Sequence, residues 1–180
     1  MSQFDLQDAI ALLSRTPLAL DSLLRGLPDT WIRQNEGGDS WTVFDVVGHL
    51  IHGEHTDWMP RVRRILEFGN TKAFDAFDRG GHKDEIQGKS LGQLLDTFAK
   101  ERAENLNALR ALNVTSADLQ KPGLHPALGG VTMSQLLATW VAHDLTHLHQ
   151  ISRIMAHQYR ETVGPWSAYL GVMRCNGHSS

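Results

Sequence analysis

The sequence predicts an all-α protein, a four-helix bundle with long inter-helix loops and a short C-terminal helix. Four long segments repeat their apolar residues at the spacing of an amphipathic helix. No run of alternating β-branched residues predicts a strand, and no internal repeat is present. A bundle is the most economical way for four such helices to bury four apolar stripes.

The first two predicted helices are each interrupted by a proline. The first spans about residues 6–24, and Pro17 should kink or break it. The second begins after Asp39-Ser40, whose side chains suit an N-cap, and runs to about residue 58. Pro60 interrupts that segment, and helical spacing resumes over Val62–Phe68. Each of these two bundle members is therefore expected to be a helix in two pieces.

Capping boxes mark the starts of the other two long helices. Ser90 and Gln93 open the third, which continues to about residue 112. Thr132 and Gln135 open the fourth, which continues to about residue 159. A short fifth helix is expected to begin at Pro165, because proline suits the first position of a helix. The connections over 69–89 and 113–131 are long for a bundle.

Composition limits the kind of protein. The chain has 180 residues, which suits a single domain over 1–180 with one core. The net charge of −3 predicts no contact with nucleic acid, and the longest apolar runs are too short to span a membrane. The single cysteine, Cys175, excludes a disulfide framework and fits the cytoplasm, and the N-terminal residues do not form a signal peptide.

The unusual feature is the stretch "WVAHDLTHLHQ" in the fourth predicted helix. Side chains four residues apart share one helix face, so His143 and His147 point the same way, toward the apolar face. Two interpretations fit this pair equally well. The imidazoles either bind one metal ion, or they are core histidines whose nitrogens bond to backbone or water. His149 is expected to be exposed.

A third ligand could come from the second helix, in the stretch "GHLIHGEHTDW". His49, His52 and His55 are the candidates, and the wheel places His49 nearly opposite the apolar arc. Each of them taken singly fits a surface histidine better. Glu54 fits either a group that orients an imidazole or an ordinary helix charge. Trp41 and Trp140 fit core anchors better than ligand contacts.

Two passages resemble the DinB-like (DinB/YfiT-type) metalloenzyme family. "WTVFDVVGHLIHGE" resembles the family's segment with tryptophan, histidine–leucine and glutamate, and the passage from Asp118 to Met155 resembles its loop, helix start and His-x-x-x-His-x-x-Gln-Ile signature. The order and separation of the motifs agree over nearly the whole chain. The resemblance implies a four-helix bundle with a three-histidine site for a divalent metal.

Residue by residue, the resemblance implies that His49, His143 and His147 hold the metal. It leaves the roles of His52 and His149 unassigned. The ion would be a divalent transition metal, zinc or nickel first, with iron or manganese also compatible with imidazole ligands. Three imidazoles leave a coordination position open, which is typical of a catalytic metal. The catalytic residues are not indicated, and Glu54 or Asp144 are candidates to orient a ligand.

The resemblance favours a metal-dependent enzyme that transfers a low-molecular-weight thiol to a small electrophilic substrate. A metal-activated hydrolase is the first alternative. The second is a stress-response module that binds a metal or ligand without catalysis. The expected partners are a small-molecule substrate, such as a low-molecular-weight thiol, and a second copy of the chain in a homodimer. Neither nucleic acid nor a membrane is expected as a partner. The sequence does not indicate the substrate, the metal or the oligomeric state.

Overall fold

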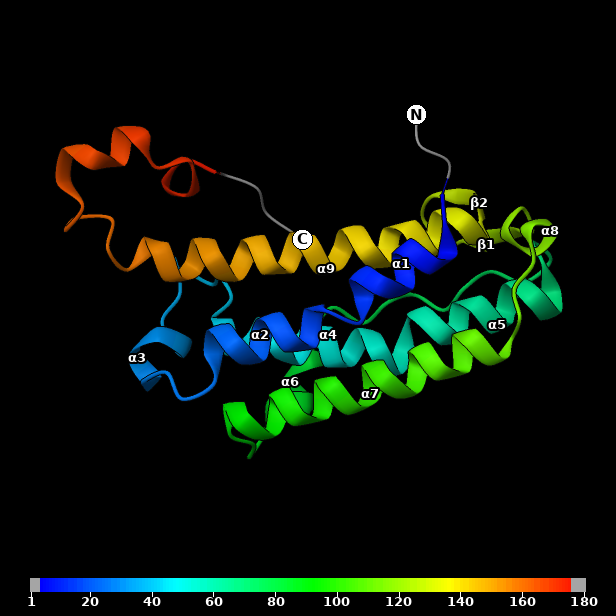
Figure 1. The fold of residues 1–180 in the computed structure, drawn as a ribbon, viewed down its shortest axis with the longest axis horizontal. Coiled ribbons are helices and arrows are strands. Elements are labelled where there is room, and N and C mark those ends of the chain that lie inside the picture. The colour runs from blue at the N-terminus through cyan, green and yellow to red at the C-terminus, as the bar shows by residue number, and fades with distance from the viewer. Residues whose placement is uncertain (1–3, 176–180) are drawn as a thin grey trace.

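The structure is a computed structural model, and it describes residues 4–175. Its long helices pack side by side as a bundle (Figure 1). The bundle has four long helical members, which confirms the predicted fold class. Two members consist of two helices each, and two are single long helices. The members are α1 Leu6–Leu13 with α2 Thr16–Leu24, α4 Val43–Thr56 with α5 Trp58–Phe68, α7 Leu91–Ala111, and α9 Met133–His157.

The breaks in the first two members follow from local chemistry. α1 ends before Ser14, and Pro17 lies in the first turn of α2, where its missing N–H costs nothing. The second break falls at Asp57, three residues before Pro60. Pro60 has no N–H to donate to the carbonyl of Thr56, so the helix ends there and a new one begins. The two-piece prediction is confirmed for both members.

Side-chain caps start the other long helices where the sequence predicted them. The capping boxes at Ser90 and Thr132 are both formed, each with a glutamine three residues later. The cap of α4 differs from the prediction, because Thr42 and Asp45 form the capping box instead of Asp39-Ser40. Thr42 is the N-cap because the residue at the third helical position, Asp45, accepts a hydrogen bond from the Thr42 N–H at 2.9 Å.

The three connecting loops contain short elements, none of which was predicted from the sequence. A hairpin of two four-residue strands, β1 Pro122–His125 and β2 Gly129–Thr132, precedes α9 and corrects the expectation that strands are absent. Strands this short contain too few residues to show an alternating pattern. The loops also contain the helices α3 Asp29–Ile32, α6 His82–Ile86 and α8 Ser116–Leu119.

The C-terminal segment differs from the single α-helix expected from Pro165. It forms two 3₁₀ helices, η1 Gly164–Tyr169 and η2 Gly171–Met173, beyond the end of α9 (Figure 1). Glycines at 164 and 171 interrupt the segment, and Trp166 and Tyr169 remain largely exposed. Little apolar area is buried here, so a longer α-helix would gain little from packing.

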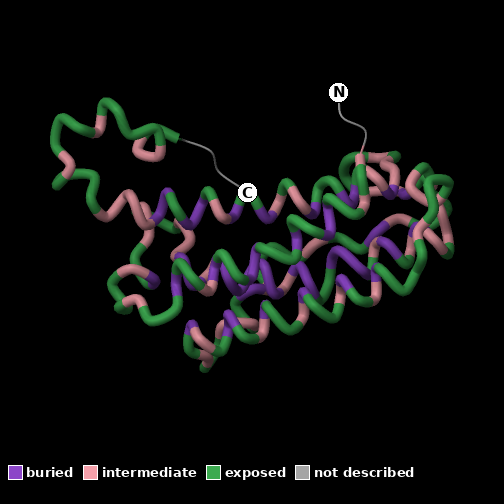
Figure 2. The backbone as a smooth tube through the Cα atoms, viewed as in Figure 1, coloured by how far each residue is buried: buried purple, intermediate pink, exposed green. Residues whose placement is uncertain are grey.

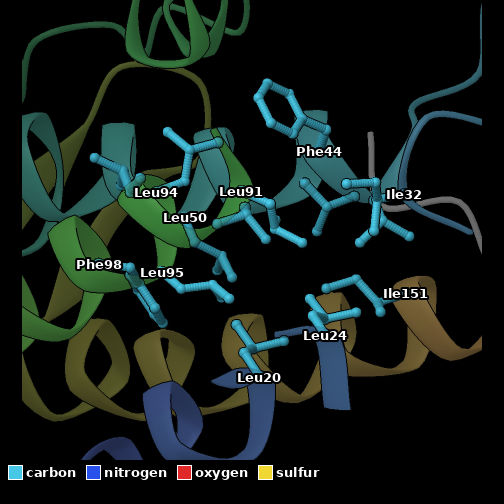
Figure 3. Close-up of a cluster of buried hydrophobic side chains, with 14 of the residues drawn as sticks. Leu20, Leu24, Ile32, Phe44, Leu50, Leu91, Leu94, Leu95, Phe98 and Ile151 are labelled. Atoms are coloured by element: carbon cyan, nitrogen blue, oxygen red, sulfur yellow. The ribbon is translucent and has the colours of Figure 1, made fainter. Parts of the chain in front are cut away.

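The core is divided in two along the bundle axis. One apolar cluster includes Leu50, Phe98 and Ile151 (Figure 3), and the other includes Trp58, Leu106 and Trp140. On α4, α7 and α9 alike, buried polar residues lie next to the boundary of the two clusters, so a polar band crosses the bundle. Figure 2 shows that buried positions continue along all three helices. The band contains Glu54 and His49 of α4, Arg102 of α7, and Asp144, His147 and Gln150 of α9.

Candidate metal centre

His49 lies inside the bundle although the helical wheel placed it opposite the apolar arc. α4 is buried on nearly every side, because it contacts α5, α6, α7 and α9 together. The wheel did not show this, because two of the buried positions are glycines, Gly48 and Gly53, which carry no apolar side chain. Only 8% of the His49 surface is exposed, so the prediction from the wheel was wrong.

The structure brings His49 together with His143 and His147 of α9. The Nε2 atom of His143 lies 3.1 Å from Nε2 of His49 and 3.0 Å from Nε2 of His147. One ligand atom from each of the three lies within 4.8 Å of the other two. The local pair is the helical i, i+4 spacing seen in the sequence, and α4 supplies the third imidazole from 94 residues away. We call these three residues the histidine cluster.

Hydrogen bonding favours a free lone pair at the centre of the cluster. Nδ1 of His147 lies 2.8 Å from Oε1 of Gln150, and the amide oxygen can only accept, so Nδ1 carries the proton. Nε2 of His147 then presents a lone pair to the other two rings. Nδ1 of His49 and Nδ1 of His143 are buried without a hydrogen-bond partner among the described residues. The imidazoles are therefore not core histidines satisfied by the backbone.

Burial keeps the cluster neutral. Burial first, and then the neighbouring His147, His82, His52 and Arg79, lower the pKa of His49 to about 3. Burial also lowers the pKa of His143 to about 2, with added repulsion from His147, His49 and Arg102. The pKa of His147 is lowered by burial as well, although its bond to Gln150 opposes the shift. Neutral imidazole is the form that binds a metal ion.

The donor set fits a divalent cation. Two nitrogens that each lie 2.0–2.1 Å from one ion are about 2.9 Å apart at a right angle and about 3.4 Å apart at the tetrahedral angle. The Nε2 separations of 3.0 and 3.1 Å fall within this range. Without a cation, the single Nε2 of His143 would face two neighbours and could pair with only one of them through a shared proton. A cation between the rings would satisfy all three lone pairs.

Glu54 and Asp144 bind Arg102 instead of a histidine. Nε and Nη2 of Arg102 donate to Oε1 of Glu54 at 3.0 and 2.7 Å, and Nη1 and Nη2 donate to Asp144 at 2.5 and 2.9 Å. Neither carboxylate has a hydrogen bond to the histidine cluster within the part of the chain that the structure describes. The direct orienting contact considered from the sequence is not formed. Asp144 does act on His147 through space, because its charge raises the pKa of that ring.

A pocket of about 900 Å³ opens onto the cluster, and His49, His143 and His147 line it. Segments that are far apart in the sequence form its walls: the loop before α4, the start of α5, the loop before α6, the hairpin and one face of α9. The long connections therefore shape the pocket. An ion pair fixes the loop before α4 to α9, because Nε of Arg153 donates to the two carboxylate oxygens of Glu36 at 2.8 and 3.0 Å.

Aromatic side chains surround the histidines inside the pocket. The ring of Trp41 lies 4.9 Å from that of His49 and stacks at 6.4 Å on His147. Phe77 contacts His49 edge-on at 5.4 Å, and Trp58 contacts His143 at 5.0 Å. Trp41 therefore lines the site, whereas the sequence favoured a role as a core anchor; Trp140 is the core anchor expected. Aromatic walls exclude water and offer flat apolar contact surface.

The remaining histidines have other roles. His52 lies beside the cluster, but its Nε2 is buried without a hydrogen-bond partner among the described residues. Nδ1 of His55 is hydrogen-bonded to Oε1 of Glu85 at 2.7 Å, and His149 is exposed as expected. His82, at the start of α6 in the connection between α5 and α7, is 3% exposed and packs on Trp41 at 4.7 Å. His178 lies outside the described residues.

The fold and the cluster define a class: helical-bundle proteins with a candidate divalent-metal pocket between two bundle members. The sequence profile of the DinB superfamily matches residues 12–151, and the chain belongs to that superfamily. This confirms the resemblance seen in the sequence.

The chain is similar over most of its length to a solved structure. That structure is YfiT from Bacillus subtilis, described as a probable metal-dependent hydrolase with an unusual four-helix bundle topology. The TM-score is 0.72 at 20% sequence identity, over 90% of each chain, which establishes a shared fold. A search of curated proteins finds no match. No helix among residues 4–175 is long and apolar enough to cross a membrane.

Proposed function

We propose that this protein is a divalent-metal-dependent hydrolase that acts on a small molecule, with His49, His143 and His147 as the metal ligands. The observation that carries the proposal is the convergence of three neutral imidazole nitrogens at the wall of a large pocket. The description of YfiT as a probable metal-dependent hydrolase agrees with this reaction class. Zinc and nickel are the first candidates for the ion, with iron and manganese next.

The ion would supply a Lewis acid and would make water acidic enough to act as a nucleophile near neutral pH. The chain contributes the conditions for that chemistry. Gln150 fixes the tautomer of His147, burial keeps all three rings unprotonated, and Trp41, Phe77 and Trp58 exclude bulk water. In the net reaction, water adds across an acyl bond and yields a carboxylic acid with an alcohol or amine.

Asp57 is the candidate to hold the proton that moves during hydrolysis. Its carboxyl lines the pocket at the break between α4 and α5 and is 8% exposed. Burial raises the pKa of Asp57, while its ion pair with Arg61 at 2.6 Å opposes the shift. A carboxyl with a raised pKa is suited to exchange protons with a leaving group.

Thiol transfer, the reaction that the resemblance favoured, stays a prediction. No contact of the described residues selects a thiol over water, so hydrolysis is preferred here. Location in the cytoplasm and pairing as a homodimer likewise remain predictions from the sequence. The same enzyme assay separates the reactions, because a thiol-plus-electrophile pair and an ester or amide can be offered to one preparation.

Metal analysis of the purified protein tests the site. We expect about one divalent ion per chain in the wild type, and a strong loss of occupancy in His49→Ala, His143→Ala and His147→Ala. The matched controls are His52→Ala, beside the cluster, and His149→Ala, on the exposed face of α9; both should keep their metal. Full occupancy in His49→Ala would overturn the ligand set.

The reaction is tested with the same samples. Metal-loaded wild type should hydrolyse a panel of aryl esters or amides, and chelator-treated protein should not until the metal is restored. Turnover of thiol-plus-electrophile pairs without hydrolysis would replace the proposal by thiol transfer. Loss of both activities, together with a large drop in melting temperature on metal removal, would favour the non-catalytic module.

A further inference from the structure

The charges along the pocket wall are not balanced. Two of its cations are paired, since Arg61 binds Asp57 and Arg153 binds Glu36. Two others, Arg79 and Lys83, line the pocket from the loop before α6 and from α6 itself, and neither has an ion-pair partner within residues 4–175. The pocket's remaining acid, Asp39, has no ion pair in that range either. The unpaired charges of this wall therefore sum to +1.

The field of Arg79 reaches the histidine cluster. Burial is the main cause of the lowered pKa of His49, and the charge of Arg79 contributes to it. Lys83 follows Arg79 by four residues, next to the buried His82 that packs on Trp41. The positive wall and the cluster thus belong to one cavity. This is notable because the chain as a whole carries a charge of −3.

An apolar surface lies beside these cations. Phe77 lies two residues before Arg79 and contacts the rings of both His49 and His52, at 5.4 and 5.1 Å. Trp41 forms a second aromatic surface of the same pocket, against His49 and His82. A molecule that enters the pocket meets flat, partly buried aromatic groups together with an exposed guanidinium and an exposed ammonium group. Guanidinium groups bind carboxylates with two parallel hydrogen bonds.

We propose that the substrate is a small organic anion, an aromatic or apolar body that bears a carboxylate, and that Arg79 and Lys83 bind the carboxylate. The inference rests on the proposed function, because it takes the pocket beside the histidine cluster as the substrate site. It adds a specificity that the metal ligands do not provide. In a concave site with apolar walls, two such charges also raise the rate at which anions enter.

The test compares two probes of nearly equal shape, phenylacetate and the neutral phenylacetamide. Binding is measured by isothermal titration on chelator-treated full-length protein at low salt, so that a carboxylate cannot bind a metal ion instead of the two side chains. We expect phenylacetate to bind at least about tenfold more tightly than the amide, with a dissociation constant of about 1 mM, reasonable for a ligand this small. The difference should shrink at high salt, since both side chains are exposed.

Variants assign the preference to residues. Arg79→Gln should weaken phenylacetate about tenfold and Lys83→Gln about threefold, and neither should change the affinity of the amide. The matched control is Lys100→Gln, an exposed cation of α7 outside the pocket, which should leave both affinities unchanged. Equal affinities for the two probes, no detectable binding of phenylacetate, or an unaltered preference in Arg79→Gln would each overturn the inference.

The affinities for phenylacetate and phenylacetamide are measured without metal, so they test the substrate class separately from the metal site. If His49→Ala loses its metal as expected but the anion preference is absent, the proposed function stands and the substrate class is wrong. If the anion preference is present but no metal binds to the wild type, the pocket binds anions and the hydrolase proposal fails.

Discussion

Replacement of Arg102 by methionine is the sharpest test of the polar band. The Arg102 side chain is 1% exposed and donates five hydrogen bonds: two to Glu54, two to Asp144 and one to the Leu13 carbonyl. It thereby joins α1, α4, α7 and α9. Methionine fills much of the same volume but leaves Glu54 and Asp144 buried without their cation.

The expected loss of stability in Arg102→Met depends on the hydrogen bonds that each carboxylate keeps without the arginine. Glu54 retains Trp140 Nε1 at 3.2 Å and the Asn105 amide at 2.9 Å, whereas no other side-chain hydrogen bond to Asp144 is found within the described chain. Removal of one partner of a buried ion pair costs about 3–5 kcal/mol. At about 2–4 °C per kcal/mol for a chain of this length, the melting temperature should fall by about 6–20 °C.

The assay is urea unfolding followed by circular dichroism at pH 7 and pH 5, on metal-free protein. Without Arg102, a buried carboxylate holds a proton more readily when folded than when unfolded. The folded variant therefore gains protons on acidification. The difference in the free energy of unfolding between the variant and the wild type should be smaller at pH 5 than at pH 7. The variant Glu54→Gln/Arg102→Met/Asp144→Asn, which has no buried charge here, should recover part of the loss.

The matched control is Arg25→Met, an arginine that also binds two acids, Asp21 and Asp96, but on the surface. It should change stability little, because exposed ion pairs are screened. If Arg102→Met lowers the free energy of unfolding by less than about 1 kcal/mol, or by an amount that does not change with pH, Arg102 is not the required counter-charge of two buried acids.

Two further predictions concern the histidines and the packing of α4. The free energy of unfolding of metal-free protein should decrease as the pH falls below about 6.5, by up to about 1.4 kcal/mol per pH unit for each buried histidine. The reason is that these histidines bind protons in the unfolded chain, whereas His49 and His143 stay unprotonated in the folded chain. Urea midpoints at pH 7, 6 and 5 measure this, and a pH dependence of stability that is unchanged in His49→Asn would contradict it. Gly48→Ala should lower the free energy of unfolding by about 1 kcal/mol, since the clash of its Cβ, 2.3 Å from Cγ2 of Ile86, outweighs the gain in helix propensity; Gly53→Ala, whose closest contact is 3.3 Å, is the control that should lose less.

Local signals predicted the elements that depend on local chemistry. The capping boxes at Ser90 and Thr132 and the interruptions at Pro17 and Pro60 involve residues a few positions apart, so the sequence alone shows them. The hairpin before α9 was missed, because its register depends on packing as much as on its own residues. Gly123 contacts Ile65 and Phe74 so closely that a Cβ there would lie 2.8 Å from each.

The site divides in the same way. The pairing of His143 with His147 is a property of one helix, and its spacing was visible in the sequence. The choice of His49 over His52 came from the family resemblance, and the geometry brings His49 into the cluster only because α4 is surrounded by other helices. The roles of Glu54 and Asp144 depended on Arg102, and no sequence signal linked the three.

The sequence by itself determined the helix pattern, the break points and one pair of histidines, because these depend on residues within two turns of each other. Only the tertiary structure decided which imidazole joins the pair, where the two carboxylates find their counter-charge, and which aromatic rings wall the pocket. Burial is the physical reason. It is a property of neighbours from distant parts of the chain, and it determines whether a polar side chain stays in water or must find a partner.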